Sequence, residues 1–240
     1  MLFAHFALLA GVAFAAATVA GVTGFGGAAI LLPALVLAYG TRDAIPILTV
    51  AQLVGNGSRV WFNRSAVDFA VVKWFALGGV PAAVVGGIIF AKAPVPFLTR
   101  LLGGFLILLV VWRRMGRAPL RMPLRKFAGL GAGASFLSAL VGSVGPLMAP
   151  FFLAYGLTKT AYIGTEALTT VIMHLTKLVV YRQSSVLSAR AMWAGLALGP
   201  AMIAGSYVGK RIVERLPERT FVVIIEVTLV AAGMLFLWRG

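Results

Sequence analysis

The sequence predicts an all-α, polytopic membrane protein made of two related helical halves. Its 240 residues are 61% hydrophobic and only 11% charged, whereas soluble domains carry about 25% charged residues. Mostly apolar stretches of about 20 residues, the length that crosses a bilayer as a helix, recur from Met1 to Trp238. We therefore expect one transmembrane domain over residues 1–240, with no separate soluble domain.

The composition also narrows the classes of function. The chain has no cysteine, which excludes disulfides, thiol nucleophiles and thiolate metal sites. Its 21 Lys and Arg against 6 Asp and Glu would suggest nucleic acid in a soluble protein, but in a membrane protein they report topology. The apolar N-terminal run has no Lys or Arg before it, unlike a signal peptide, so we interpret it as a retained first helix.

The two halves of the chain share motifs in the same order. LAYG at Leu37–Gly40 recurs at Leu153–Gly156, and Thr49-x-Ala51 recurs as Thr165-x-Ala167. PAAVVGG, which begins at residue 81, is matched by PAMIAGS from residue 200, so the separation drifts only from 116 to 119 residues. This order indicates a duplication. We assign repeat 1 to residues 1–112, a basic linker to 113–126 and repeat 2 to 127–240.

Each half is expected to begin with a pair of half-helices. Residues 127–158 contain no charge over 32 positions, too many for one span and fewer than the roughly 40 that two spans need. GSVGP at Gly142–Pro146 interrupts this stretch, and GVTGFGG at Gly21–Gly27 is its first-half counterpart, because Gly and Pro weaken or end helices. Backbone N–H and C=O groups that leave a helix within the hydrocarbon core need hydrogen-bond partners from protein or water. Two matched, re-entrant breaks therefore predict a central cavity.

Three spans should follow the broken pair in each half. We place them at 44–62, 70–91 and 97–112 in repeat 1, and at 160–181, 189–208 and 220–238 in repeat 2.

The distribution of basic residues favours inverted repeats. Cytoplasmic loops carry the excess of Lys and Arg, so the linker is placed inside. An odd number of crossings per half then puts 13 basic residues inside and six outside, whereas an even number gives 11 and eight. The loop Lys210–Arg219 contributes most of this margin on the inside, and the loop Gln183–Ala189 falls outside.

Polar side chains form a stripe on one helix of each half. An ionisable group at membrane depth is costly and marks a function by default; five candidates qualify: Arg59, Glu166, His174, Lys177 and Glu226. Glu166, Thr170, His174 and Lys177 share one helical face, as do Thr49, Gln52, Asn56 and Arg59. One cation and one neutral hydrogen-bonding group from each half, assisted by half-helix N-termini, predict an anion site.

Other interpretations of these residues remain open. Arg59 and Lys177 each lie about one turn before another basic residue and could extend to the membrane interface. Glu166 could complement a helix dipole, Glu226 could pair in a packing contact, and His174 could be a core residue. Alternatively, Glu166, His174 and Glu226 are candidates for proton coupling, since histidine changes charge near neutral pH.

Three segments carry a resemblance to a known family: GVTGFGGAAILLPALVLAYG, GSVGPLMAPFFLAYGL and AYIGTEALTTVIMHLTKLVVY. Together with the duplicated halves, the chain resembles the sulfite exporter TauE/SafE family of anion permeases over essentially its whole length. The resemblance implies transport of sulfite, sulfonates, sulfoacetate or related small organic anions across the bacterial inner membrane, without ATP and with proton coupling.

The resemblance also implies where substrate binds. The two glycine motifs fall on Gly24–Gly27 and Gly142–Pro146, and the GT-x-A element falls on Gly164–Ala167. Its first-half counterpart, Leu48–Ala51, lacks the glycine, which gives the second-half residues more weight. The predicted substrate-binding residues are Gly24, Phe25, Gly26, Gly27, Thr49, Gln52, Asn56, Arg59, Gly142, Ser143, Gly145, Pro146, Thr165, Thr169, His174 and Lys177.

These observations favour a secondary anion carrier that works by alternating access. Its expected partners are a small anion and the lipid bilayer, with a homo-oligomer as a further expectation, and no cofactor, metal or nucleic acid. No enzyme signature competes, since GFGG lacks the lysine of a phosphate-binding loop. The alternative is a membrane scaffold subunit whose basic segments bind a partner protein or anionic lipid.

Overall fold

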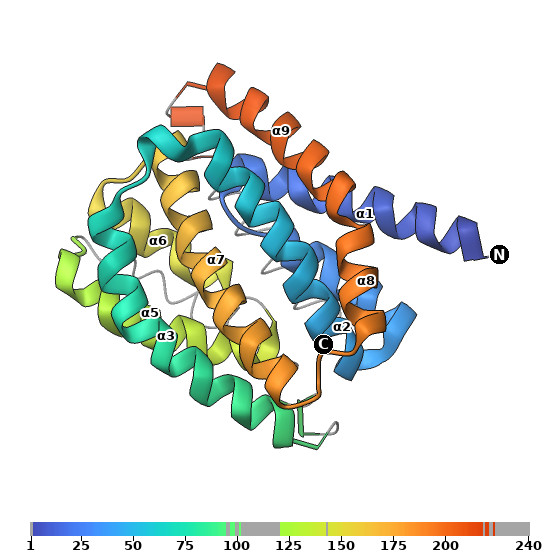
Figure 1. Cartoon of the computed structure of the whole chain (residues 1–240). Helices are drawn as coiled ribbons and strands as arrows, with labels where there is room; N and C mark the ends of the chain where they lie inside the picture. Colours follow the sequence, from blue (N-terminus) through green and yellow to red (C-terminus); the bar gives the residue numbers. More distant parts are fainter. Residues whose placement is uncertain are drawn as a thin grey trace.

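The regular secondary structure of the described residues is helical (Figure 1). The computed structural model describes residues 2–94, 97–98, 101, 121–142, 144–217, 219–220 and 223. The α-helices of the first half are α1 (Leu2–Thr23), α2 (Gly27–Asn63) and α3 (Phe69–Lys92). Those of the second half are α5 (Phe127–Val141), α6 (Gly145–Tyr155), α7 (Lys159–Gln183), α8 (Ala189–Ala197) and α9 (Gly199–Arg215). The short 3-10 helices η1 (Arg64–Ala66) and η2 (Leu124–Lys126) precede α3 and α5.

Five segments of the described chain are long and apolar enough to cross a membrane: Phe6–Thr23, Gly27–Ala66, Phe69–Lys92, Lys159–Gln183 and Ala189–Arg215. Large apolar side chains also point outward from them. Leu37 is 90% exposed and Trp193 is 70% exposed, which water would oppose but lipid tails accept. The prediction of a multi-pass, all-α membrane protein is confirmed.

The predicted break in each half is present. In the first half α1 ends at Thr23 and α2 begins at Gly27, while in the second α5 ends at Val141 and α6 begins at Gly145. Gly26 and Gly142 have φ angles of 89° and 86°, in the region that residues with a Cβ rarely adopt. Glycine is therefore what allows the chain to leave the helix at both places.

The repeated LAYG motif also has a structural counterpart. α2 contains a kink at Gly40, whose φ is 77°, and α6 ends at Gly156, whose φ is 104°. In both halves a half-helix thus ends at this glycine, and a long helix carrying the polar stripe follows. Gly26 and Gly142, like Gly40 and Gly156, are separated by 116 residues, so the backbone supports the duplication.

The two halves are interlocked through glycine-lined helix contacts. α3 of the first half packs on α5 of the second, where a Cβ at Gly86 would lie 2.7 Å from the Phe136 carbonyl oxygen. In the reciprocal pair α9 packs on α1, where a Cβ at Gly209 would lie 2.7 Å from the Cα of Gly21. α3 therefore covers the first helix of the second half, and α9 covers the first helix of the first half, as Figure 1 shows for α9 and α1.

The long helices α2 and α7, which carry the two polar stripes, run in opposite directions. α7 begins beside the end of α2, since a Cβ at Gly164 would lie 3.0 Å from the Cβ of Asn63. At the other end of the molecule the Arg42 guanidinium donates to the Ala91 and Ala93 carbonyls at 2.8 and 3.0 Å, and the Phe90 ring packs on Tyr181. The opposite directions of α2 and α7 agree with inverted repeats, and both the inverted repeats and the orientation in the membrane stay predictions.

The span predicted at 189–208 is present within one apolar segment, Ala189–Arg215. A one-residue interruption at Leu198 divides it into α8 and α9, because Pro200 has no N–H to donate to the carbonyl one turn before it. The predicted loop Lys210–Arg219 was wrong in its first part, since α9 continues to Arg215. Lys210 and Arg211 lie 3.4 and 3.8 Å from Glu214 carboxylate oxygens, and basic residues suit the C-terminal turns of a helix.

The remaining predicted spans, 97–112 and 220–238, fall almost entirely outside the described residues, as does the linker up to residue 120.

Labelling of single cysteines should place Arg125 in the cytoplasm and Ser185 outside. Both side chains are exposed, and because the chain has no native cysteine, each introduced thiol is unique. A membrane-impermeant maleimide added to intact cells should label Ser185→Cys at once, and Arg125→Cys or Pro217→Cys only after lysis. Labelling of Arg125→Cys before that of Ser185→Cys would reverse the topology.

Candidate functional site

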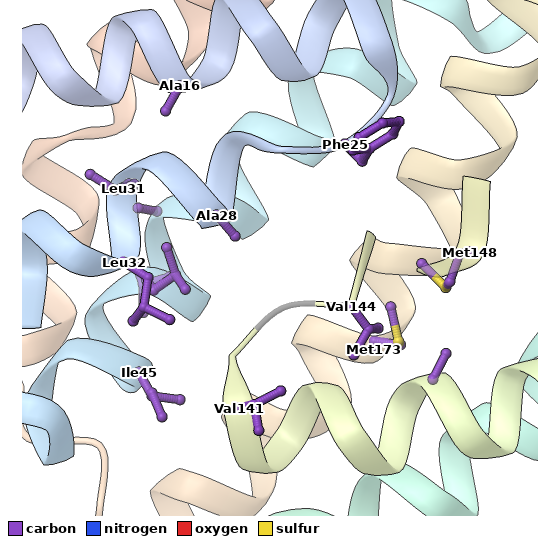
Figure 2. Packing of buried hydrophobic residues seen from close by; sticks show 14 of the residues in the cluster. Ala16, Phe25, Ala28, Leu31, Leu32, Ile45, Val141, Val144, Met148 and Met173 are labelled. Atoms are coloured by element: carbon purple, nitrogen blue, oxygen red, sulfur yellow. The ribbon is translucent and has the colours of Figure 1, made fainter. Parts of the chain in front are cut away.

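A cavity lined by apolar, polar and charged residues lies between the two helix breaks. The space inside it that a water-sized sphere can occupy is about 30 Å³, so in this conformation the cavity is small. Figure 2 shows Phe25 of the first break across from Val144 and Met148 beside the second. The lining combines both breaks with side chains of α1, α2, α5, α6 and α7: Ala20, Gly24, Phe25, Gly26, Gly27, Ala28, Gln52, Asn56, Arg59, Ser138, Gly142, Val144, Gly145, Met148, Glu166, Thr170, Met173 and His174.

The breaks direct the N-termini of two helices to this cavity. α2 begins at Gly27 and α6 at Gly145, and both residues line the cavity. No N-cap side chain accepts a hydrogen bond from the first turn of either helix. Uncapped first-turn N–H groups carry a partial positive charge and favour anions.

Local hydrogen bonds shape the first break. The Thr23 hydroxyl donates to the Val19 carbonyl at 2.9 Å and to the Phe25 carbonyl at 2.7 Å. The Phe25 N–H in turn donates to the Thr23 oxygen at 3.4 Å. Thr23 therefore satisfies backbone groups that the end of α1 leaves without helical partners.

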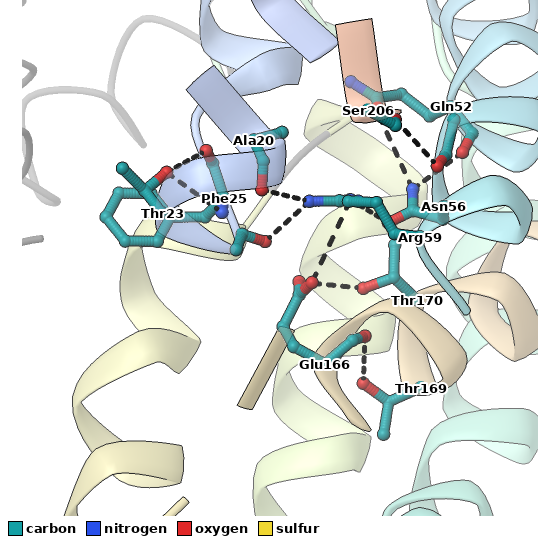
Figure 3. Close-up of polar contacts among 12 residues, drawn as sticks. Ala20, Thr23, Phe25, Gln52, Asn56, Arg59, Glu166, Thr169, Thr170 and Ser206 are labelled. Atoms are coloured by element: carbon teal, nitrogen blue, oxygen red, sulfur yellow. Dashed lines mark hydrogen bonds and ion pairs between the residues drawn. The ribbon is translucent and has the colours of Figure 1, made fainter. Parts of the chain in front are cut away.

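Arg59 is the positively charged residue of the cavity (Figure 3). Its side chain is 4% exposed. Nη1 donates to the carbonyls of Ala20 and Gly24 at 2.8 and 3.0 Å, and Nη2 donates to Asn56 Oδ1. The two carbonyls belong to the C-terminal end of α1, where a cation is favoured. This burial excludes the interpretation in which Arg59 extends to the membrane interface.

Glu166 supplies a negative charge opposite Arg59. Its Oε2 lies 4.0 Å from Arg59 Nη2, and its Oε1 accepts a hydrogen bond from the Thr170 hydroxyl at 3.0 Å. Oε2 has no hydrogen-bond partner among the described residues. Glu166 lies two turns inside α7, which begins at Lys159, so it does not complement the dipole at the start of that helix. The pair is a loose contact between two buried charges.

Neutral polar groups complete the wall. The Asn56 amide donates to the Gln52 carbonyl at 2.7 Å while its oxygen accepts from Arg59. His174 on α7 is 3% exposed and lines the cavity. Its Nδ1 has no hydrogen-bond partner within the described part of the chain, so a core histidine with satisfied nitrogens does not describe it. His174 offers a binding group to a ligand.

Lys177 is buried just outside the lining. It is 0% exposed, and its Nζ donates to the Ser138 hydroxyl at 3.0 Å and to the Ser138 carbonyl at 3.3 Å. Since Ser138 lines the cavity, Lys177 reaches it only through that residue. The interpretation that Lys177 extends to the membrane interface is excluded by this burial.

The structure brings together most of the residues predicted to bind substrate, with some exceptions. Thr49, Thr165 and Thr169 are buried away from the cavity. The hydroxyls of Thr49 and Thr169 donate to backbone carbonyls of their own helices, and the Thr165 hydroxyl accepts from the Asp68 N–H at 2.9 Å. Ser143 and Glu226, and the side chain of Pro146, lie outside what the structure describes.

Sequence reasoning missed several lining residues. Ser138, Met148 and Met173 line the cavity but stand in apolar stretches where nothing distinguishes them from core positions. Of these three, only Ser138 could have been identified from the sequence. A small hydroxyl residue close to a glycine break can form hydrogen bonds with backbone groups that the break leaves without helical partners.

Taken together, the arrangement suits a small anion. A guanidinium and two uncapped helix N-termini supply positive potential, and His174 and Asn56 can bond further oxygens. Among the described residues that line the cavity, Glu166 is the one carboxylate, and it lies 4.0 Å from Arg59. Because the groups are buried, their fields are weakly screened and act strongly on a bound ion.

Comparison with known proteins gives one match. The family model described as Sulfite exporter TauE/SafE matches residues 9–236, a range that includes both breaks, every cavity-lining residue and α9. No curated protein and no solved structure matches the chain.

Proposed function

The chain belongs to the sulfite exporter TauE/SafE family of membrane anion transporters, and from this we propose that it carries sulfite or a related small organosulfur or carboxylate anion across the bacterial inner membrane. The observation that carries the proposal is Arg59, a buried guanidinium in a cavity onto which two uncapped helix N-termini open. An oxyanion matches these donors, because a guanidinium binds two oxygens at once.

Transport would proceed by alternating access around this cavity. The cavity lies where the two halves meet, and each half contributes one broken helix pair and one long helix to it. Movement of one half against the other would expose the anion to either side of the membrane. The close contacts of α3 with α5 and of α1 with α9 tie helices of the two halves together, so such a movement would have to change these contacts.

Glu166 is proposed to couple the anion to a proton. The anion and the Glu166 carboxylate compete for Arg59. When Glu166 is protonated it becomes neutral, so its attraction to the guanidinium is lost and the anion can bind there. Among the described residues, Arg59 and Tyr162 are ionisable groups that interact with Glu166, and His174 shares the cavity lining with it. One anion and one proton would then cross together.

The Glu166→Gln variant should lose the response of transport to a pH gradient. Glutamine keeps the size of the side chain and a hydrogen bond with Thr170 but cannot exchange a proton. The measurement is uptake of a sulfonate, which keeps its charge across the range used, with and without an imposed gradient. Glu214→Gln on the exposed end of α9 is the control, since it should respond as wild type does. A full gradient response in Glu166→Gln would refute the coupling role.

A flux panel tests the function itself. Purified protein in liposomes should exchange labelled sulfite. Unlabelled sulfite, sulfate, sulfoacetate and taurine are then added as competitors, and the inhibition of exchange by each gives their order of affinity. Taurine, which carries a positive amine, should compete worse than sulfoacetate at a site built around Arg59. Absence of exchange for every anion would favour the alternative, a membrane scaffold subunit.

A further inference from the structure

The two buried cations are held in the same way in the two halves. Arg59 Nη1 donates to the Ala20 carbonyl at 2.8 Å, and Lys177 Nζ donates to the Ser138 carbonyl at 3.3 Å. The sequence separation between donor and acceptor is 39 residues in both bonds. Both members of the second pair lie 118 residues after those of the first. Each half thus ties its cation to the C-terminal end of its own first helix.

The environments of the two cations differ. Arg59 lines the cavity and has Glu166 at 4.0 Å. Lys177 is enclosed, and the described residues place no carboxylate within ion-pairing distance of it. The position equivalent to Glu166 in the first half, by the match of Thr49-x-Ala51 with Thr165-x-Ala167, is Val50, which is buried and apolar.

Exchange of the conformations of the two halves would reverse these environments. Lys177 would then occupy the cavity wall and Arg59 the enclosed position. Where Arg59 now has Glu166, Lys177 would have the apolar Val50. A buried charge without a partner is costly, so the countercharge would have to come from a bound anion.

We infer that Lys177 is the anion-binding cation of the exchanged state, so that the substrate passes from Arg59 to Lys177 as the carrier turns over. This rests on the alternating-access function proposed above. His174 supports the inference, because it precedes Lys177 by three residues as Asn56 precedes Arg59. Asn56 already bonds its cation, and the Nδ1 of His174 has no partner among the described residues.

The experiment measures half-saturating sulfite concentrations separately at the two faces of liposomes that hold the protein in one orientation. Lys177→Gln should raise this concentration roughly ten- to hundredfold at one face only, the loss expected for a charged hydrogen bond. Arg59→Gln should raise it at the opposite face. Arg182→Gln, an exposed residue at the end of α7, should leave both faces as in wild type.

Equal changes at both faces, or no change at either, in Lys177→Gln would overturn the inference while wild-type exchange still supported transport. No exchange by the wild type would instead refute the proposed function. Lys177→Arg is measured in parallel because it keeps the charge in altered geometry. If Lys177→Gln fails to fold, a shift confined to the same face in Lys177→Arg supports the inference, and a two-sided or absent shift refutes it.

Discussion

Arg59→Gln should weaken anion affinity by roughly two orders of magnitude at the face to which the Arg59 cavity opens. The substitution removes the cavity's guanidinium and its charge-assisted hydrogen bonds, each contributing about 1.5–3 kcal/mol. It also leaves Glu166 buried without a cation, so the free protein should unfold at a lower temperature. The measurements are sulfite-dependent thermal stabilisation in detergent and counterflow in liposomes.

Two variants make this result specific. Arg64→Gln alters an exposed arginine that stacks on Trp61 near the end of α2 and should bind sulfite as wild type does. The double variant Arg59→Met with Glu166→Leu removes both buried charges and should recover much of the lost stability without recovering transport. Wild-type sulfite affinity in Arg59→Gln would show that the cavity is not the binding site.

Gly24→Ala should be the most destabilising of the glycine substitutions at the breaks. Gly24 has a φ of 80°, where alanine costs about 1–2 kcal/mol. Its Cβ would also overlap the buried ring of Tyr162, and overpacking of this kind adds about 1–3 kcal/mol. The expected result is a large loss of thermal stability together with loss of transport, because the cavity wall at Gly24 moves.

Gly40→Ala is the matched control for this substitution. Gly40 has a φ of 77°, but nothing lies within 4 Å of the Cβ that alanine would add. It should therefore show the backbone cost alone. Comparison of the two melting temperatures isolates the contact with Tyr162, and equal losses in both variants would contradict the packing explanation.

The breaks and the cavity could be predicted from the sequence because their cause is local. Glycines at Gly24–Gly27 and near Gly142 act on their own backbone, and the apolar length around them is too short for two full spans. The stripe of Gln52, Asn56 and Arg59 was equally readable, since helical periodicity places these residues on one face.

The detailed roles of the polar residues could not be predicted, because they depend on neighbours far along the chain. Helical periodicity places Lys177 on the same face as His174. The Lys177 ammonium is nevertheless enclosed and does not line the cavity, because Ser138 of α5 binds it and lies between it and the cavity. The partner of Thr165 is the backbone of Asp68, which no local pattern reveals. α9 likewise continues to Arg215, where Glu214 pairs with Lys210 and Arg211 and reduces the repulsion between these basic residues.

The crossed packing of α3 on α5 and of α9 on α1 bears on how the predicted repeats could have arisen. Neither half alone would cover the glycine surfaces of its own first helix. On the predicted inverted duplication, a half-length ancestor would bury those surfaces against a second copy of opposite orientation in the membrane. Such a polypeptide would have to enter the bilayer in both orientations, and fusion of two copies would fix one orientation for each.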